Sequence, residues 1–141
     1  LGVLIDKNKY MAEREGKWQP FRNFYVNGTS YGGMIGSAKG LIRYAQALLD
    51  KTYPLLDEAY WKILFTEARA AGRLTGMSLS WFTGTLKGNR YYAHAGGGGG
   101  YYVEWRLYPE LGVGSVVLNN RTGMRDERML DKTDGYFLTD K

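Results

Sequence analysis

The clearest pattern of hydrophobic positions lies between Ser37 and Asp50. Apolar residues recur there at intervals of three and four, which places them on one face of a helix: Leu41, Ile42, Ala45, Leu48 and Leu49. Ser37 is suited to cap this helix, because its hydroxyl can accept a hydrogen bond from a backbone N–H of the first turn. The pattern predicts an amphipathic helix over residues 38–50, with Pro54 preventing its continuation.

A second helical pattern follows Pro54. It predicts a helix over residues 57–70, which Gly72 is well placed to end. The residues expected to supply its buried face are Ala59, Tyr60, Ile63, Leu64 and Ala68. The two helices therefore lie next to each other in the chain.

After Gly76 the hydrophobic period changes from helical spacing to two. Met77, Leu79 and Trp81 alternate with serines, which predicts a strand with one apolar and one polar face. Lys87-Gly88-Asn89 is typical of a tight turn, and 90–95 is expected to return as the partner strand.

Two further strands are expected beyond the five glycines of 96–100. In the strand 101–108, one face carries Tyr101, Val103, Trp105 and Leu107. A turn over 109–112 leads to 113–119, whose nearly continuous apolar character predicts a strand covered on both faces. The tail contains a weaker helical pattern around 126–130.

The order of these elements predicts an α+β fold: an antiparallel meander of three or four strands with flanking helices. We expect a single partial domain over 1–141. Its parts are a loop-rich lead-in (1–30), two helices (31–72), antiparallel strands (76–120) and a tail (121–141). The lead-in shows no sustained period of either kind, so it is predicted to be mostly loop.

Composition excludes several classes of function. The net charge is +5, but the basic residues are scattered singly, and a nucleic-acid-binding surface normally clusters them. The hypothesis that the chain binds nucleic acid is therefore supported by composition alone. Strong, salt-dependent binding to RNA or DNA would favour it. With one His and no Cys, a zinc site built by the protein is not expected. No apolar run approaches the ~20 residues that span a bilayer.

The glycine run is the first candidate for chemistry. A phosphate-binding loop would be followed by a helix and a Lys-Ser/Thr pair, whereas 96–100 is followed by a strand pattern. Taken alone, the run predicts a flexible hairpin connection. Its position matters because the only histidine, His94, ends the strand that leads into it.

Four blocks in order and at suitable spacing resemble a known family. They are Tyr31-Gly-Gly-Met-Ile-Gly-Ser-Ala-Lys-Gly-Leu41, Tyr92-Ala-His-Ala-Gly-Gly97, Arg106-Leu-Tyr-Pro-Glu-Leu-Gly-Val-Gly114 and Val116-Val-Leu-Asn-Asn120. Together they resemble the C-terminal sheet, and the helix preceding it, of β-lactamase and penicillin-binding-protein-like serine hydrolases. The most similar members are class C-like enzymes, D-aminopeptidases and related esterases. The resemblance spans about 31–120.

The resemblance implies a site on the second strand of this sheet. His94-Ala95-Gly96 matches the family's third catalytic motif, Lys/His-x-Gly. The implied catalytic residues are His94, Gly96 and Gly97, with the backbone N–H of Gly97 in an oxyanion hole. Ala95 and Gly98 are the implied substrate-binding residues. No cofactor and no metal ion is implied.

Two departures from the family pattern qualify this reading. Ala95 replaces the usual Ser or Thr, whose hydroxyl helps to hold a substrate carboxylate, so esters, amides or another acyl substrate are favoured over penicillins. The nucleophile motif Ser-x-x-Lys is absent from all 141 residues. Tyr25-Val26-Asn27 has the letters of the family's Tyr-x-Asn motif but lies too close to Gly32, so we interpret it as coincidence.

We therefore expect a C-terminal part of a serine hydrolase that is inactive alone. Its expected partners are the missing N-terminal part of the same protein and a small acyl substrate, with self-association through an exposed strand edge as a further expectation. Family resemblance favours a periplasmic or secreted location. A noncatalytic binding or structural module on the same fold remains the alternative.

Overall fold

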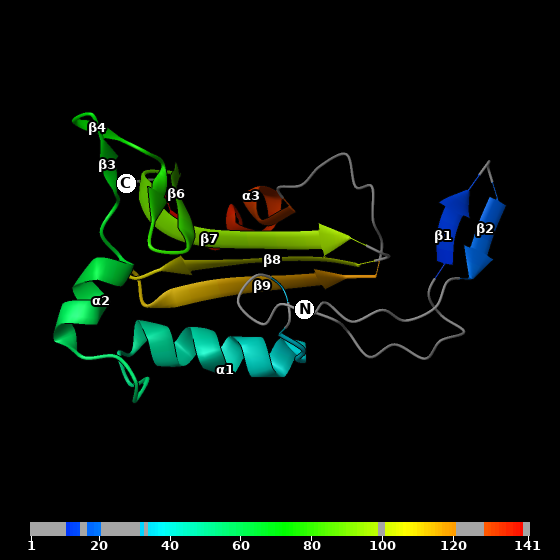
Figure 1. The fold of residues 1–141 in the computed structure, drawn as a ribbon, viewed down its shortest axis with the longest axis horizontal. Helices are drawn as coiled ribbons and strands as arrows, with labels where there is room; N and C mark the ends of the chain where they lie inside the picture. The colour runs from blue at the N-terminus through cyan, green and yellow to red at the C-terminus, as the bar shows by residue number, and fades with distance from the viewer. Residues whose placement is uncertain are drawn as a thin grey trace.

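A five-stranded antiparallel sheet forms the centre of the molecule (Figure 1). The computed structural model describes residues 11–14, 17–20, 32, 34–98, 101–120 and 129–139. The sheet is a meander whose strands follow the chain: β5 (Met77–Ser78), β6 (Trp81–Leu86), β7 (Asn89–Gly98), β8 (Tyr101–Tyr108) and β9 (Val113–Asn119). The helices are α1 (Ala38–Leu49), α2 (Glu58–Leu64) and α3 (Met129–Asp134). This combination confirms the predicted α+β class.

Part of the N-terminal stretch forms a hairpin where we predicted mostly loop. Strands β1 (Met11–Arg14) and β2 (Lys17–Pro20) pair antiparallel, so the loop prediction is wrong for these residues. Each strand has four residues, which is too short for an alternation to stand out in the sequence. The rest of the stretch 1–30 lies outside the described residues.

Helix α1 follows the predicted pattern closely. The Gly40 N–H donates to the Ser37 hydroxyl at 3.1 Å, so Ser37 caps the helix as expected. Leu41, Ala45 and Leu48 are buried. Ile42 is 48% exposed, so the buried stripe is narrower than predicted.

Helix α2 is shorter than predicted and buries a different residue. It ends at Leu64, and the last residues of the expected helix form β3 (Arg69–Ala70), which pairs with β4 (Arg73–Leu74). Gly72 turns this small hairpin with a φ of +77°. Trp61 is the one buried residue of α2, whereas most of the predicted face is exposed: Ala59, Tyr60, Ile63 and Ala68. A helix of two turns has room for a single anchor, and the largest side chain takes that place.

The alternation after Gly76 does not form a single strand. A turn at Leu79–Ser80 reverses the chain, so that Ser78 pairs with Trp81 across a two-residue loop. Of the two loop residues only Ser80 has a positive φ, of +65°, which is the pattern of a type II turn. Ser78 is consequently buried and Leu79 is 55% exposed, the opposite of the prediction.

The next turn agrees with its sequence signature. Lys87 and Gly88 both have positive φ, which is typical of a type I′ turn, and Leu86 pairs with Asn89. Strand β7 then continues through Gly96, Gly97 and Gly98, each paired with β8. The prediction of a flexible connection is therefore wrong for these three glycines, and residues 99–100 lie outside the described part.

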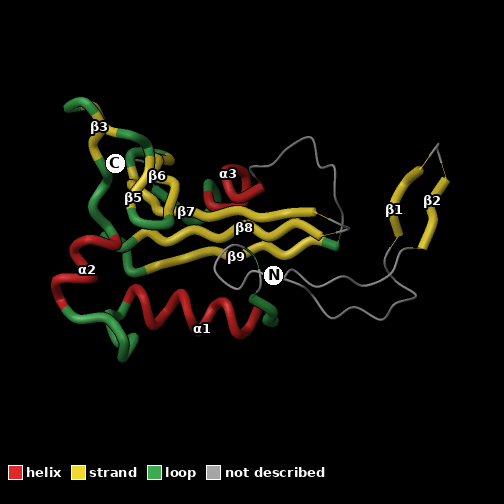
Figure 2. The backbone as a smooth tube through the Cα atoms, viewed as in Figure 1, coloured by secondary structure: helices red, strands yellow, loops and turns green. Residues whose placement is uncertain are grey.

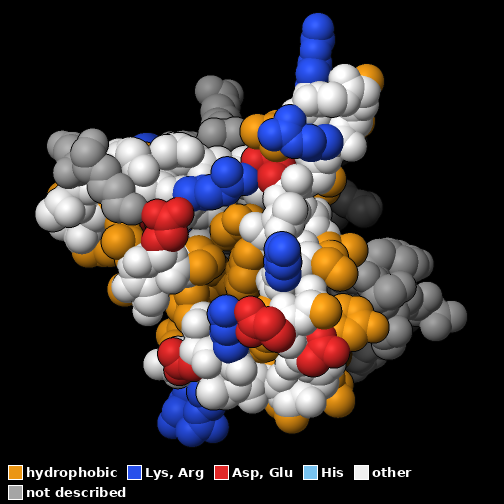
Figure 3. Space-filling model, turned by 90° about the vertical axis from the view of Figure 1, so that its left-hand side faces the viewer, with side chains coloured by type: hydrophobic (Ala, Val, Ile, Leu, Met, Phe, Trp, Pro, Cys, Tyr) orange, Lys and Arg blue, Asp and Glu red, His pale blue; other side chains and the backbone are white. Residues whose placement is uncertain are grey.

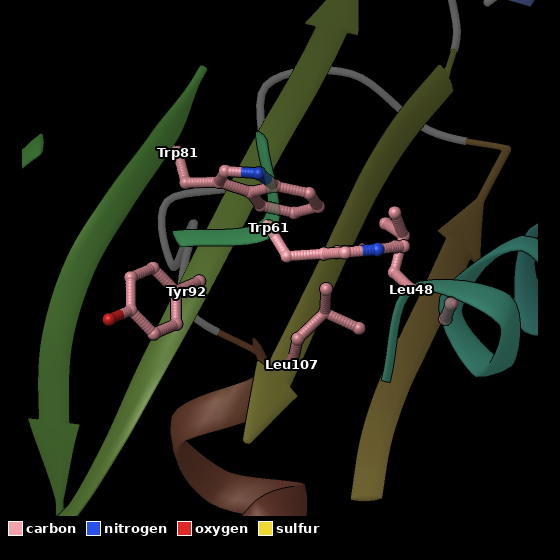
Figure 4. Close-up of a cluster of buried hydrophobic side chains, with 6 residues drawn as sticks. Leu48, Trp61, Trp81, Tyr92 and Leu107 are labelled. Carbon is pink, nitrogen blue, oxygen red and sulfur yellow. The ribbon is translucent and has the colours of Figure 1, made fainter. Parts of the chain in front are cut away.

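Helices α1 and α3 lie on opposite faces of the sheet (Figures 1 and 2). The α1 face carries the larger core: Ala45, Leu48, Trp61, Trp81, Tyr92 and Leu107. Figure 4 shows the Trp61 side chain between Trp81 and Leu107, reaching toward Leu48. The α3 face carries a smaller cluster of Tyr91, Ala93, Tyr108 and Leu138.

Strand β8, rather than β9, is the strand buried on both faces. Leu107 and Tyr108 of β8 are fully buried on opposite sides. Strand β9 contacts both α1 and α3 but is an edge strand among the described residues, and its side chains are half-buried or exposed. Helix α3 includes Met129 and Leu130 of the expected helix, and the other expected residues, 126–128, lie outside the described residues.

No helix in the described ranges is long and apolar enough to cross a membrane. The longest is α1, with 12 residues.

Trp61 is expected to be the residue of α2 on which stability depends. Trp61→Ala should lower the free energy of unfolding by about 3–5 kcal/mol, because it leaves a cavity in the α1-face core. Tyr60→Ala is the matched control, since Tyr60 is 55% exposed and should change stability by less than about 1 kcal/mol. Urea unfolding followed by fluorescence measures both; equal losses would contradict the assignment of Trp61 as the anchor.

Candidate active site

The second half of β7 has an unpaired edge. Strand β6 pairs with β7 only as far as Phe82↔Ala93, whereas β8 pairs with β7 from Tyr92 to Gly98. Among the described residues, 94–98 therefore have a neighbouring strand on one side alone. This segment contains every site residue that the sequence predicted: His94, Ala95, Gly96, Gly97 and Gly98.

The strand register determines which backbone groups face the open side. In an antiparallel ladder, successive residues direct their N–H and C=O groups to alternate neighbours. The two-residue turn at 87–88 directs Asn89 toward β6, and by alternation Tyr91, Ala93, Ala95 and Gly97 face the same way. The pairing of Gly98 with Tyr101 leads to the same result, because Gly98 then faces β8 and its neighbour Gly97 faces away from β8. The N–H groups of Ala95 and Gly97 thus point to the unpaired edge.

The His94 side chain lies on the α1 face of this edge. It is exposed, its cross-strand neighbour is Trp105, and its ring centroid lies 5.8 Å from that of Phe82. Trp105 itself packs on Trp81 and Tyr44, with ring centroids 4.6 and 5.5 Å away. The imidazole is therefore presented beside the glycine edge by an aromatic cluster.

A charged network lies behind the edge, on the α3 face. Tyr102, Glu104 and Arg106 of β8 are all buried, and they stand opposite the smallest residues of β7: Gly97, Ala95 and Ala93. The Tyr102 hydroxyl donates to Glu104 Oε2 at 3.2 Å, and Arg106 Nη2 donates to Glu104 Oε1 at 2.9 Å. Small residues on β7 thus leave room for three large side chains on β8.

Arg106 connects this network to α3. Its Nη2 lies 2.6 Å from Asp131 Oδ1, and its guanidinium lies over the Tyr91 ring, 4.4 Å from the centroid. Burial lowers the pKa of Arg106, but the hydrogen bonds with Asp131 and Tyr108, together with the electrostatic interactions with Tyr91 and Asp131, outweigh it, so the net shift is upward and Arg106 stays cationic. Nε and Nη1 have no hydrogen-bond partner among the described residues.

The Tyr91 ring also restricts which residue can occupy position 84 of the neighbouring strand β6. Gly84 of β6 is the cross-strand partner of Tyr91, and a Cβ on Gly84 would collide with the Tyr91 hydroxyl and ring. Glycine at this position thus keeps the ring beneath Arg106.

A second polar cluster fixes α3 to the sheet. Asp134 Oδ2 accepts hydrogen bonds from the Tyr108 hydroxyl at 2.7 Å and the Ser115 hydroxyl at 2.9 Å. Burial, together with the adjacent Asp134 carboxylate, raises the pKa of Tyr108 above its ordinary value. Tyr108 therefore remains a neutral donor.

Two cavities flank the edge, one on each face of the sheet. The larger, of about 390 Å³, is lined on the α3 side by Gly76, Phe82, Thr83, Tyr91, Ala93, His94, Ala95, Tyr102, Glu104 and Arg106. The smaller, of about 100 Å³, is lined by His94, Ala95, Gly96, Tyr101, Val103 and Trp105. His94 and Ala95 contribute to both, so they form the rim between them.

Glu67 supports the start of the sheet next to this site. The Gly76 N–H donates to Glu67 Oε1 at 2.8 Å, and Arg90 of β7 pairs with Glu67 Oε2. The hydrogen bond from Gly76 and, to a lesser degree, the Thr83 side chain and the Arg90 charge hold the pKa of Glu67 below its usual value, although burial opposes this shift. Glu67 thereby ties the segment after α2 to β7.

The sequence pattern does not mark Glu67, Glu104 and Arg106 as residues of the site. Two charged residues that alternate with Val103, Trp105 and Leu107 are the ordinary pattern of a strand with one solvent-exposed face. Only the packing of α3 shows that this face is buried.

The side of the molecule that carries α2 and the β3–β4 hairpin exposes further apolar surface. Figure 3 shows hydrophobic side chains between charged ones on this side, and the exposed residues of these elements include Tyr60, Ile63 and Leu74. A groove of about 550 Å³ here is lined by Lys62, Ile63, Thr66, Glu67, Ala68, Ser78 and Leu79.

No group of three or more His, Cys, Asp or Glu within the described ranges could hold a metal ion. The site is therefore described by its backbone donors, His94 and the buried charges.

The family model described as Beta-lactamase matches residues 5–135, which includes all the elements around this edge. The chain belongs to the β-lactamase family. Membership of this family confirms the serine-hydrolase type that the four sequence blocks suggested. Comparisons with curated proteins and with solved structures found no match.

Glu67 should give the stability of this β-lactamase-family chain a defined pH dependence. Because the pKa of Glu67 is lower in the folded state, the ionised carboxylate stabilises the folded state fully above about pH 4.3, the ordinary pKa of a Glu carboxyl. This stabilisation is lost as the pH falls through the lowered pKa of the folded state. Glu67→Gln should therefore destabilise the chain at pH 7 and much less at pH 3. Urea unfolding at both pH values measures this.

Glu58→Gln is the matched control for this prediction, because the Glu58 side chain is 84% exposed and its only described ion pair, with Lys51, is long at 3.6 Å. A loss in Glu67→Gln that is the same at both pH values would show that the Glu67 charge is not responsible.

Proposed function

We propose that this chain supplies one wall of an acyl-transfer active site in a serine hydrolase of the β-lactamase family. His94, Gly96 and Gly97 are the proposed catalytic residues, and Ala95 and Gly98 are proposed to contact substrate. The observation that carries the proposal is the unpaired edge of β7, which directs the N–H groups of Ala95 and Gly97 away from the sheet.

The chemistry of acyl transfer suits such an edge. Attack on an ester or amide carbonyl places negative charge on its oxygen, and a backbone N–H already oriented toward that oxygen stabilises the transition state by about 2.7–4 kcal/mol. The N–H of Gly97 is the proposed donor. Within the described ranges, no heavy atom beyond the chain neighbours of Gly96 lies within 4 Å of the position that a Cβ would take there, which leaves open space for a substrate.

His94 is proposed to act next to this donor. Its imidazole is exposed on the same segment and can donate a hydrogen bond or carry charge near a serine nucleophile. Proton transfer by a positioned side chain contributes roughly 10²–10⁴-fold in rate. This role corresponds to the family's Lys/His-x-Gly motif.

Ala95 affects which substrates the site is proposed to accept. Without the hydroxyl that helps to hold a carboxylate, the site favours an ester, an amide or another acyl substrate over penicillins. This favours the esterase and D-aminopeptidase relatives of the class C-like group as the functional analogues.

The nucleophile is proposed to come from a segment with Ser-x-x-Lys, which is absent from the 141 residues. We infer that the chain is the C-terminal part of the family domain and forms a single unit with that segment. The half-buried edge strand β9 is a suitable place for a further strand to pair, and without one it would favour self-association. Family membership favours a periplasmic or secreted location.

The absence of Ser-x-x-Lys also favours a second candidate, a noncatalytic binding module that keeps the fold. Reconstitution of activity distinguishes the two candidates.

The chain alone should not react with serine-directed reagents, because its sequence lacks the Ser-x-x-Lys motif that activates the serine in this family. Incubation with a fluorophosphonate probe, followed by mass spectrometry, should show no stoichiometric adduct, and hydrolysis of a nitrophenyl ester should stay at background. Addition of a Ser-x-x-Lys-bearing family segment should yield labelling at that serine. Labelling of a serine within this chain would contradict the proposal, and failure of every complementing segment would favour the noncatalytic module.

In the complemented enzyme, His94→Ala should lower kcat roughly 10²-fold or more, with an unchanged melting temperature because the ring is exposed. Thr85→Ala, at an exposed position of β6, is the matched control and should leave kcat unchanged. Unchanged kinetics in His94→Ala would show that the histidine is an ordinary residue of the strand.

A further inference from the structure

We propose that the cavity of about 100 Å³ on the α1 face of the unpaired edge holds an aromatic ring of the substrate, and that Tyr101 and Trp105 are the residues that select this ring. The inference rests on the proposed function in taking the bound ring to be part of an acyl substrate. Binding of a ring requires no nucleophile, so it is measurable on the chain by itself.

The cavity results from the absence of side chains at the end of β7. Gly96, Gly97 and Gly98 leave the neighbouring side chains of β8 uncovered along this stretch of the sheet. Alternate residues of a strand share one face, so the side chains of β8 on the α1 face stand together opposite this gap. They are Tyr101, Val103 and Trp105, which pair with Gly98, Gly96 and His94.

The Trp105 ring is held in place by neighbours on its other sides. It stacks on Tyr44 of α1, with ring centroids 5.5 Å apart and an interplanar angle of 29°, and it packs on Trp81 at 4.6 Å. Trp105 is nevertheless only half-buried, and it lines the cavity. A ligand ring would therefore meet an aromatic surface that is already ordered, which lowers the entropic cost of binding.

The size and lining of the cavity indicate a single ring. An engineered cavity of about 150 Å³ in another protein binds benzene. The present cavity is smaller, but it opens to solvent at the exposed residues His94 and Gly96, so a ring can project from it. Aromatic rings attract one another beyond the burial of their surface, so Tyr101 and Trp105 favour an aryl group over a saturated group of equal size.

A ring in this cavity would lie beside the proposed oxyanion donor. Gly96 lines the cavity, and Gly97 is the next residue, about 3.3 Å further along the strand. A carbonyl that accepts from the Gly97 N–H can therefore carry an aryl group, one or two bonds away, that occupies the cavity. The inference names the substrate class as esters or amides with an aromatic ring close to the reacting carbonyl.

Titration of the full chain with two uncharged probes of similar size tests the proposal. In ¹H–¹⁵N NMR spectra, benzyl alcohol should perturb the amides of Gly96 and Val103 and the Trp105 Nε1–H signal, with saturation in the millimolar range expected for one ring. Cyclohexylmethanol, its saturated counterpart, should bind about threefold or more weakly, because it has no π face. A cavity that recognised only apolar surface would prefer cyclohexylmethanol, the more hydrophobic of the two.

Variants of the lining make the test specific. Gly96→Val should weaken the binding of benzyl alcohol at least about tenfold, because its side chain enters the open space over Gly96 and fills the cavity. Gly36→Val is the matched control, since Gly36 is an exposed glycine with equally open surroundings. Trp105→Leu should abolish the preference for benzyl alcohol over cyclohexylmethanol. If loss of the Trp105 packing prevents that variant from folding, Gly96→Val still decides the outcome.

Equal or tighter binding of cyclohexylmethanol by the unaltered chain would overturn the proposal, as would the absence of any perturbation by benzyl alcohol. Equal effects of Gly96→Val and Gly36→Val would also overturn it, and so would perturbations confined to the cavity on the α3 face, at Tyr91 and Tyr102. Selective binding of benzyl alcohol without any reconstituted acylation would leave the ring site intact and count against the proposed function only. Reconstituted acylation without ring binding would overturn this inference alone.

Discussion

The burial of Arg106 in the middle of β8 is the constraint on which the surrounding structure depends. A guanidinium with 2% of its side chain exposed needs carboxylates within hydrogen-bonding distance, and Glu104 and Asp131 provide them from β8 and α3. The Asp131 side chain is 34% exposed, so its ion pair contributes less than a fully buried pair would, but α3 is held in place by charge as well as by apolar contact. The aromatic core on the opposite face lets the same strand be buried on both sides.

The open edge of β7 follows from the lengths of its neighbours. Strand β6 is short because the chain reverses at Leu79–Ser80, so it covers β7 only as far as Ala93. Strand β8 continues to the end of β7 and holds the glycine segment in an extended conformation. The glycines are thus supported on one side and accessible on the other, which is how a backbone can be both fixed and available to a ligand.

Local sequence signals predicted the elements that are determined locally. The Ser37 cap, the Leu41–Leu48 stripe and the Lys87-Gly88 turn depend on residues within a few positions of each other, and each was found. Trp61, Ser78 and the Glu104–Arg106 pair could not be assigned, because their burial depends on segments distant in the sequence. The unpaired edge belongs to the same class, since it depends on where β6 ends and not on any residue of the glycine run itself.

The collision that a side chain on Gly84 would have with Tyr91 links three positions on three adjacent strands. The Tyr91 ring lies under the Arg106 guanidinium, and both residues line the larger cavity. Gly84 therefore affects the shape of that cavity through Tyr91, although Gly84 is not itself a lining residue. Substitutions at the two positions therefore depend on each other. A side chain at position 84 fits only after Tyr91 has been replaced by a smaller residue. A lineage that made that exchange would gain a deeper cavity, and an engineer seeking larger ligands would have to change the two positions together.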